Sequence, residues 1–94
     1  MRVEWLRGAL KDLEEEAAYI ALENPEAANR FSEAVFASVD KLALFPAMGR
    51  EGRISGTREW AIADWPYLIP YRVRNNRLQI LSVFHTRRSP PSSW

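Results

Sequence analysis

The stretch that decides the fold is GTREWAIADWPYLIPYRVRNNRLQILSVFHTRR, which runs from Gly56 to Arg88. Its aromatic and β-branched residues are typical of strands. Three successive strands are predicted, at residues 58–63, 67–74 and 77–84. Asp64-Trp65-Pro66 interrupts the first pair, and Asn75-Asn76 occupies a two-residue hairpin position that favours positive φ. Pro70 cannot donate a ladder hydrogen bond, so it predicts a bulge or a nitrogen that faces away from the neighbouring strand.

The residues that precede this stretch predict a short strand at 2–5 and a helix at about 7–22. The helix carries apolar residues at three- and four-residue spacing, which indicates one buried face. The residues of this face are Leu6, Leu10, Leu13, Ala17 and Ile20. The three consecutive glutamates at 14–16 mostly fall off that face, and we expect them in solvent.

A second helix is predicted from Pro25 to Leu44, because Asn24 is a good cap and proline suits the first helical position. Its expected buried residues are Ala28, Phe31, Val35, Val39 and Leu42, with Phe36 and Phe45 widening the face. Residues 46–56 are expected to form a polar, mobile loop. The chain is therefore predicted to be one α+β domain over residues 1–94, an N-terminal two-helix hairpin packed on a small, mainly antiparallel β-sheet.

Composition narrows the possible functions. The 94 residues are 47% hydrophobic, as expected of a globular chain with one core. There is no cysteine and one histidine, which excludes disulfides and thiolate zinc sites, and we expect neither metal nor cofactor. No run approaches the roughly 18 apolar residues of a membrane helix, and the N-terminus lacks the apolar core of a signal peptide. A cytoplasmic protein without a membrane partner is expected.

The net charge of +1 conceals an asymmetry between the two halves of the chain. Residues 1–48 carry five basic and nine acidic side chains, so 5 − 9 = −4. Residues 49–94 carry eight arginines and three acids, so 8 − 3 = +5. Arginine presents a planar, permanently charged fork that suits phosphate or carboxylate. The second half therefore predicts either an acidic partner, such as nucleic acid or an acidic protein segment, or a solvated arginine face.

No phosphate loop, GxGxxG, HExxH or GxSxG motif is present. The residues needed for RNA cleavage by 2′-hydroxyl attack do occur, namely a base, an acid and cations for the phosphorane charge. His85 would be base or acid, Glu59 a second base, Tyr67 or Tyr71 a stacking partner or proton donor, and Arg58, Arg72, Arg87 and Arg88 the cations. The structural alternatives are a backbone-bonded histidine, two core tyrosines and cross-strand arginine pairs. The position of Arg87-Arg88, after the last strand, favours contact with a partner.

The order of five motifs resembles that of the ParE/RelE superfamily of toxins from type II toxin–antitoxin modules, also called the plasmid stabilisation family. The motifs are ALKDLEEEAAYI (9–20), KLALFPAMGR (41–50), GTRE (56–59), PYLIPYRV (66–73) and ILSVFHTRR (80–88). The resemblance covers nearly the whole chain and implies helices packed on a small antiparallel sheet. It also implies a cognate antitoxin that binds through an acidic or amphipathic segment.

The resemblance implies two alternative targets. RelE-like members cleave mRNA on the ribosome with basic residues and a tyrosine or histidine near the C-terminus, whereas ParE-like members inhibit DNA gyrase. Here the loop before the sheet has Arg50 and Arg53 but no lysine, and no tyrosine follows Arg87-Arg88. The layout is closer to ParE-like members. The target-binding residues would then be Arg87, Arg88, Arg72, Arg58 and Tyr67. A RelE-like nuclease would use His85, Arg58, Arg72 and Arg87, and a non-toxic or degenerate binding module is the third alternative.

Overall fold

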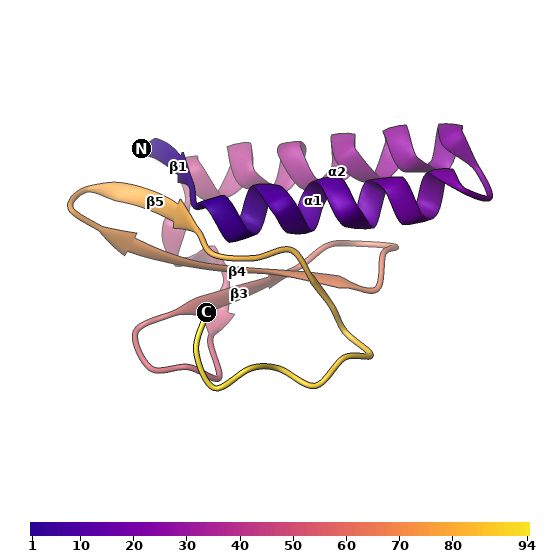
Figure 1. Cartoon of the computed structure of the whole chain (residues 1–94). Helices are drawn as coiled ribbons and strands as arrows, with labels where there is room; N and C mark the ends of the chain where they lie inside the picture. Colours follow the sequence, from indigo (N-terminus) through magenta and orange to yellow (C-terminus); the bar gives the residue numbers. More distant parts are fainter.

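The structure is a computed structural model that describes all residues from Met1 to Trp94. Two helices lie side by side on one face of a six-stranded sheet, and the C-terminal residues cross the opposite face (Figure 1). The elements are β1 (Arg2–Trp5), α1 (Arg7–Ala21), α2 (Pro25–Leu44), the 3-10 turn η1 (Pro46–Met48), β2 (Arg50–Glu51), β3 (Arg58–Ala61), β4 (Tyr67–Arg74), β5 (Arg77–Ile80) and β6 (Phe84–His85). The predicted α+β class and helix hairpin are confirmed.

The strand order is β1-β5-β4-β3-β2, and β6 pairs with β4 beyond the end of β5. β1 runs parallel to β5, whereas the other pairs are antiparallel. The β4–β5 hairpin turns at Asn75 and Asn76, whose φ angles are 53° and 61°, as the sequence predicts. Asn24 caps α2 through its side-chain oxygen, which accepts a hydrogen bond from Ala27 N at 3.0 Å.

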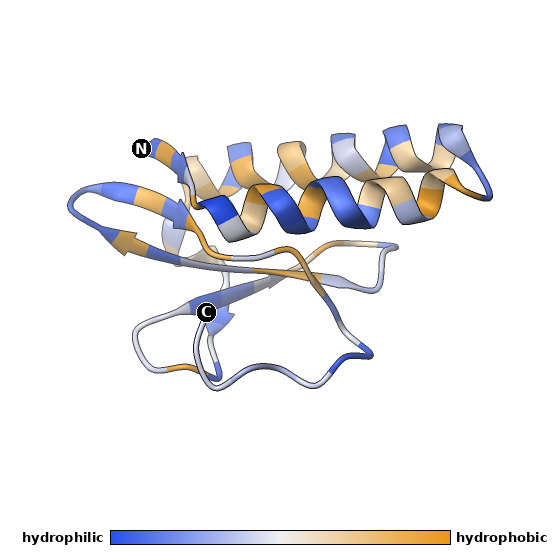
Figure 2. Cartoon of the chain, viewed as in Figure 1, coloured by the Kyte–Doolittle hydropathy of each residue, from blue (hydrophilic) through white to orange (hydrophobic).

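The core lies between the helices and the sheet, and all five expected α2 residues are buried. All of them except Ala28 belong to one core cluster, to which β4 and β5 contribute Ile69, Tyr71, Leu78 and Ile80. Hydrophilic residues colour much of the outer surface of the helices (Figure 2). Neither helix has the length and apolar character that crossing a membrane would require.

The buried face of α1 agrees with the prediction in part. Leu13 is buried, and Ala17 and Ile20 are partly buried against the core, whereas Leu10 is 43% exposed. The other buried residues of α1 are Ala9 and Glu16. Phe36 and Phe45 do not widen the buried face of α2, since both are exposed.

The third predicted strand is divided into β5 and β6. Two residues of β4, Ile69 and Pro70, lie opposite three residues, 81–83, which form a bulge. Pro70 has no N–H to satisfy there, and its carbonyl accepts from Leu81 N at 2.9 Å. The side chain of Asp12 accepts from Ser82 Oγ at 2.6 Å and from Val83 N at 3.2 Å, which fixes the bulge to α1.

The segment at residues 46–56 is more ordered than expected, because it contains η1 and β2. The Tyr71 hydroxyl donates to Pro46 O at 2.6 Å and accepts from Gly49 N at 2.9 Å. A side chain at Gly49 would collide with that hydroxyl, so glycine is required by the close approach. Glu59 lies opposite Arg50 in the β2–β3 pair and holds the end of the segment.

Candidate functional site

The C-terminal segment, residues 84–94, begins with β6, which pairs with the first residues of β4. His85 lies opposite Tyr67 in the antiparallel register. Thr86 N donates to Pro66 O at 2.9 Å, and Arg88 N donates to His85 O at 3.1 Å. These backbone bonds fix the turn that carries Arg87 and Arg88 at one end of the sheet.

A buried carboxylate holds this turn against α1. The Tyr67 hydroxyl donates to Glu16 Oε1 at 2.7 Å, and Arg88 Nη2 lies 3.1 Å from Glu16 Oε2. The His85 ring packs edge-on against the Tyr67 ring, with centroids 5.0 Å apart. We call these four residues the Glu16 cluster. It joins α1, β4 and the C-terminal segment.

The electrostatics of the cluster explain its composition. Glu16 is only 5% exposed, so its charge requires partners inside the protein. Arg88 supplies the opposite charge and Tyr67 a hydrogen-bond donor. Burial, and then the hydrogen bond to Glu16, raise the pKa of Tyr67 well above its ordinary value. The phenol therefore remains a donor at neutral pH.

One sequence-based expectation is wrong at this cluster. Glu16 is expected in solvent, yet it lies at the centre of the buried contact. Tyr67 is 3% exposed, which agrees with the core alternative given for the two tyrosines. The signal for Glu16 was present, because it follows Leu13 by three residues and precedes Ile20 by four. An acidic residue in line with an apolar face indicates a buried pair whose partner is distant in sequence.

His85 and Arg87 form the outward side of the same turn. His85 is half-buried, and its Nδ1 accepts from Arg87 N at 3.1 Å, which is the backbone-bonded arrangement given as the structural alternative. The Arg87 side chain is exposed and has no hydrogen-bond or ion-pair partner within the protein. Of the two neighbouring arginines, Arg88 thus has an internal partner and Arg87 is free to meet an external one.

The other predicted arginines lie elsewhere and are engaged. Arg58 Nη1 donates to Gly49 O at 2.8 Å. Arg72 Nε donates to Gln79 Oε1 at 2.7 Å on the face opposite the helices. Arg58 of β3 lies opposite Tyr71 of β4, whereas His85 lies opposite Tyr67. These two positions on β4 are four residues apart, or about 13 Å at the usual strand rise. The set His85, Arg58, Arg72 and Arg87 is not brought together.

The remaining acid–base candidates are also occupied. The Glu59 side chain is 1% exposed, with Arg50 Nη2 at 3.2 Å and Arg53 Nε at 3.7 Å. Tyr71 is fully buried, and burial raises its pKa. Both residues hold the segment around η1 and β2 through these internal contacts. No group of three or more His, Cys, Asp or Glu side chains is placed to hold a metal ion.

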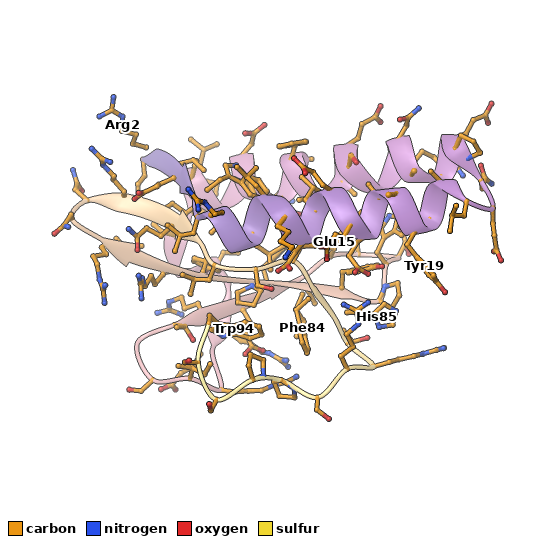
Figure 3. The ribbon with its side chains drawn as sticks, viewed as in Figure 1. Arg2, Glu15, Tyr19, Phe84, His85 and Trp94 are labelled. Carbon is orange, nitrogen blue, oxygen red and sulfur yellow. The ribbon has the colours of Figure 1, made fainter.

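The far end of the C-terminal segment folds back on the sheet. The rings of Trp94 and Phe84 meet edge-on with centroids 5.2 Å apart, and both lie on the side away from the helices (Figure 3). A hollow of about 290 Å³ lies beside this contact, lined in part by Asp12, Ser82 and Arg88. The segment is thus attached at both ends, by the Glu16 cluster and by Trp94.

A helix hairpin on a mixed sheet, with a C-terminal segment fastened to both, defines a protein of the RelE/ParE-like fold. The family model for the ParE toxin of type II toxin–antitoxin systems, parDE, matches residues 3–90. This chain therefore belongs to the ParE toxin family, and it is the toxin of a type II toxin–antitoxin module.

Two known proteins are similar over nearly the whole chain. The Y4kP protein of Sinorhizobium fredii (strain NBRC 101917 / NGR234), named a putative toxin, is 44% identical over 90 residues, covering 96% of this chain and 93% of that protein. A chain of the chromosomal ParDE TA system from P. aeruginosa superposes with a TM-score of 0.81 at 28% identity, covering 93% of this chain and 97% of that one. The resemblance to the ParE-like branch is confirmed.

Proposed function

We propose that this toxin acts in the cytoplasm by inhibiting DNA gyrase, and that a cognate antitoxin neutralises it through an acidic or amphipathic segment. The observation that carries the choice of gyrase is the match of residues 3–90 to the ParE toxin family. The arrangement of the arginines agrees, because ribonuclease chemistry needs a base, an acid and cations around one phosphate. Here Arg58 and Arg72 bind within the protein and far from His85.

The target contact is assigned to the turn at the C-terminal segment. Arg87 is its free cation, and the half-buried His85 lies beside it. Arg88 and Tyr67 act from beneath, because both bind Glu16 and so fix where Arg87 points. Arg58 and Arg72 are assigned supporting roles in η1 and in the sheet.

The antitoxin contact is assigned to the open edge of β3. β2 pairs only with Arg58 and Glu59, so the edge at Trp60 and Ala61 has no neighbouring strand. An extended segment can add to such an edge through main-chain hydrogen bonds. An apolar hollow lies beside this edge, between Trp60 and Ala37 of α2, and it suits the apolar side of an amphipathic segment.

The test is to induce the chain alone in a bacterial host and follow nucleoids and mRNA together. Filamentation and DNA-damage signalling with intact mRNA are expected, and Arg87→Ala should reduce them. Arg30→Ala is the matched control, because it removes an exposed arginine of α2. A rapid stop in translation with cleaved mRNA would contradict the gyrase proposal in favour of the nuclease, and harmless expression would indicate a degenerate module.

A further inference from the structure

Three arginines form a straight row across three neighbouring strands. Arg2 of β1 lies opposite Arg77 of β5, and Arg77 lies opposite Arg74 of β4. Leu78 of β5 faces the core, so alternation along the strands places the adjacent Arg77 and the opposite Arg74 on the other face of the sheet, and Arg2 continues the row at the start of β1. At the usual spacing between strands, the row spans roughly 10 Å.

This row is not neutralised within the protein. The only acid on these three strands is Glu4, which accepts from Gln79 Nε2 at 2.8 Å. Gln79 in turn accepts from Arg72, so the neighbouring row of side chains is satisfied. None of the four ion pairs in the structure involves the three arginines. Like charges directly opposite on neighbouring strands repel, so the row is a local cost to folding.

The surroundings of the row are polar and project from the body. The hairpin that joins Arg74 to Arg77 ends in Asn75 and Asn76, which are exposed and bear amide donors. Figure 3 shows Arg2 extending into solvent beyond β1, at the end of the molecule that carries the N-terminus. On this face, β1 and β5 offer only arginine, glutamate and glutamine side chains. The exposed Met1 and Val73 adjoin the row in sequence, but Val73 pairs with the core-facing Leu78 on the other face, so this face offers a protein partner little apolar surface.

We propose that this arginine row binds the phosphate backbone of a nucleic acid. Guanidinium forks pair with phosphate oxygens in bidentate geometry, and an evenly spaced line of cations suits a line of phosphates. The row lies at the opposite end of β4 from Tyr67, about 23 Å away at the usual strand rise, so it is separate from the C-terminal turn. The toxin itself would thereby hold the nucleic acid while another surface meets the protein target.

The test measures binding of the purified toxin to a fluorescent 20-base-pair DNA duplex at several salt concentrations. Each phosphate contact contributes a slope of about −0.9 to the logarithmic salt dependence, so three contacts give about −2.7. Affinity should then fall about forty-fold between 50 and 200 mM salt. The variant Arg2→Ala/Arg74→Ala/Arg77→Ala should lose this slope. A second variant with lysine at these positions should keep most of the slope and bind more weakly, because it lacks the fork.

The matched control removes the same charge from the helices as Arg7→Ala/Arg30→Ala/Lys41→Ala, all at exposed positions. This control variant should retain the salt dependence of duplex binding. An equal loss of affinity and salt dependence in both triple variants would show an effect of net charge alone and would overturn the proposal. The same measurement with a single-stranded RNA of equal length identifies which nucleic acid the row binds. The ligand that binds more tightly, and loses this affinity in the alanine variant, is the one assigned to the row. Equally tight, row-dependent binding of a polyglutamate peptide would overturn it in favour of an acidic protein partner. The urea midpoint of the alanine variant should be no lower than that of the parent.

The measurement uses no gyrase. Failure of duplex binding would therefore leave the gyrase proposal standing, and failure of gyrase inhibition would leave the arginine row intact as a phosphate site.

Discussion

Neighbouring arginines at the C-terminal turn should behave differently when each is replaced by alanine. Arg88→Ala leaves the Glu16 carboxylate buried with the Tyr67 hydroxyl as its remaining partner. A hydrogen bond to a charged group contributes about 1.5–3 kcal/mol. The Arg88 side chain is 61% exposed and water can partly replace it, so we expect the lower part of that range, about 1.5–2 kcal/mol. Arg87→Ala should change the free energy of unfolding by less than about 0.5 kcal/mol, because its side chain has no internal partner.

Urea denaturation and thermal melting measure both variants. For a domain of this size, 1 kcal/mol corresponds to about 4–8 °C, so Arg88→Ala should melt roughly 6–16 °C below the parent. A double-mutant cycle with Glu16→Ala should show coupling with Arg88→Ala and none with Arg87→Ala. Toxicity should follow the opposite order, with Arg87→Ala losing activity at unchanged stability. Equal stability of the two variants would refute the account of the Glu16 cluster.

Three further results are expected. Gly49→Ala should destabilise the protein by about 1–3 kcal/mol in urea titrations, because its new methyl group meets the Tyr71 hydroxyl, whereas the exposed Gly8→Ala should not. Asn24→Ala removes the cap of α2 and should cost about 1 kcal/mol, and Asn24→Ser should restore most of it; a neutral Asn24→Ala would contradict the capping assignment. The pKa of Tyr67 is raised in the folded protein, so the contribution of its hydroxyl to stability is complete below pH 10 and is lost at higher pH. The urea midpoint of the parent protein should therefore decrease as the pH rises above 10. The decrease should be smaller in Tyr67→Phe, which has no phenol to ionise.

Local signals explain why much of the fold could be predicted. Asn24-Pro25 fixed the start of α2, and Asn75-Asn76 fixed the β4–β5 turn, because each acts through backbone geometry within a few residues. The bounds of β4, Tyr67–Arg74, were also correct. Pro70 predicted the bulge opposite residues 81–83, which is confirmed. The sequence did not predict that the third strand ends there, because Asp12 of α1, which binds residues 82 and 83, lies some seventy positions away.

The candidate site was harder to predict for the same reason. Sequence pattern identified His85 and Arg87-Arg88 as a unit after the last strand, but it gave the two arginines one role. The distinction between them is set by Glu16, which lies 72 positions before Arg88 in a run of three glutamates that predicts exposure to solvent. Arg58 and Arg72 were grouped with them by charge alone, whereas the strand register separates them.

Supercoiling of relaxed plasmid by purified gyrase, in the presence of this toxin, tests the central claim most directly. The account predicts that the parent protein and Arg30→Ala inhibit supercoiling, and that Arg87→Ala inhibits it weakly while remaining folded. Full gyrase activity at an excess of folded toxin, together with mRNA cleavage on added ribosomes, would contradict it.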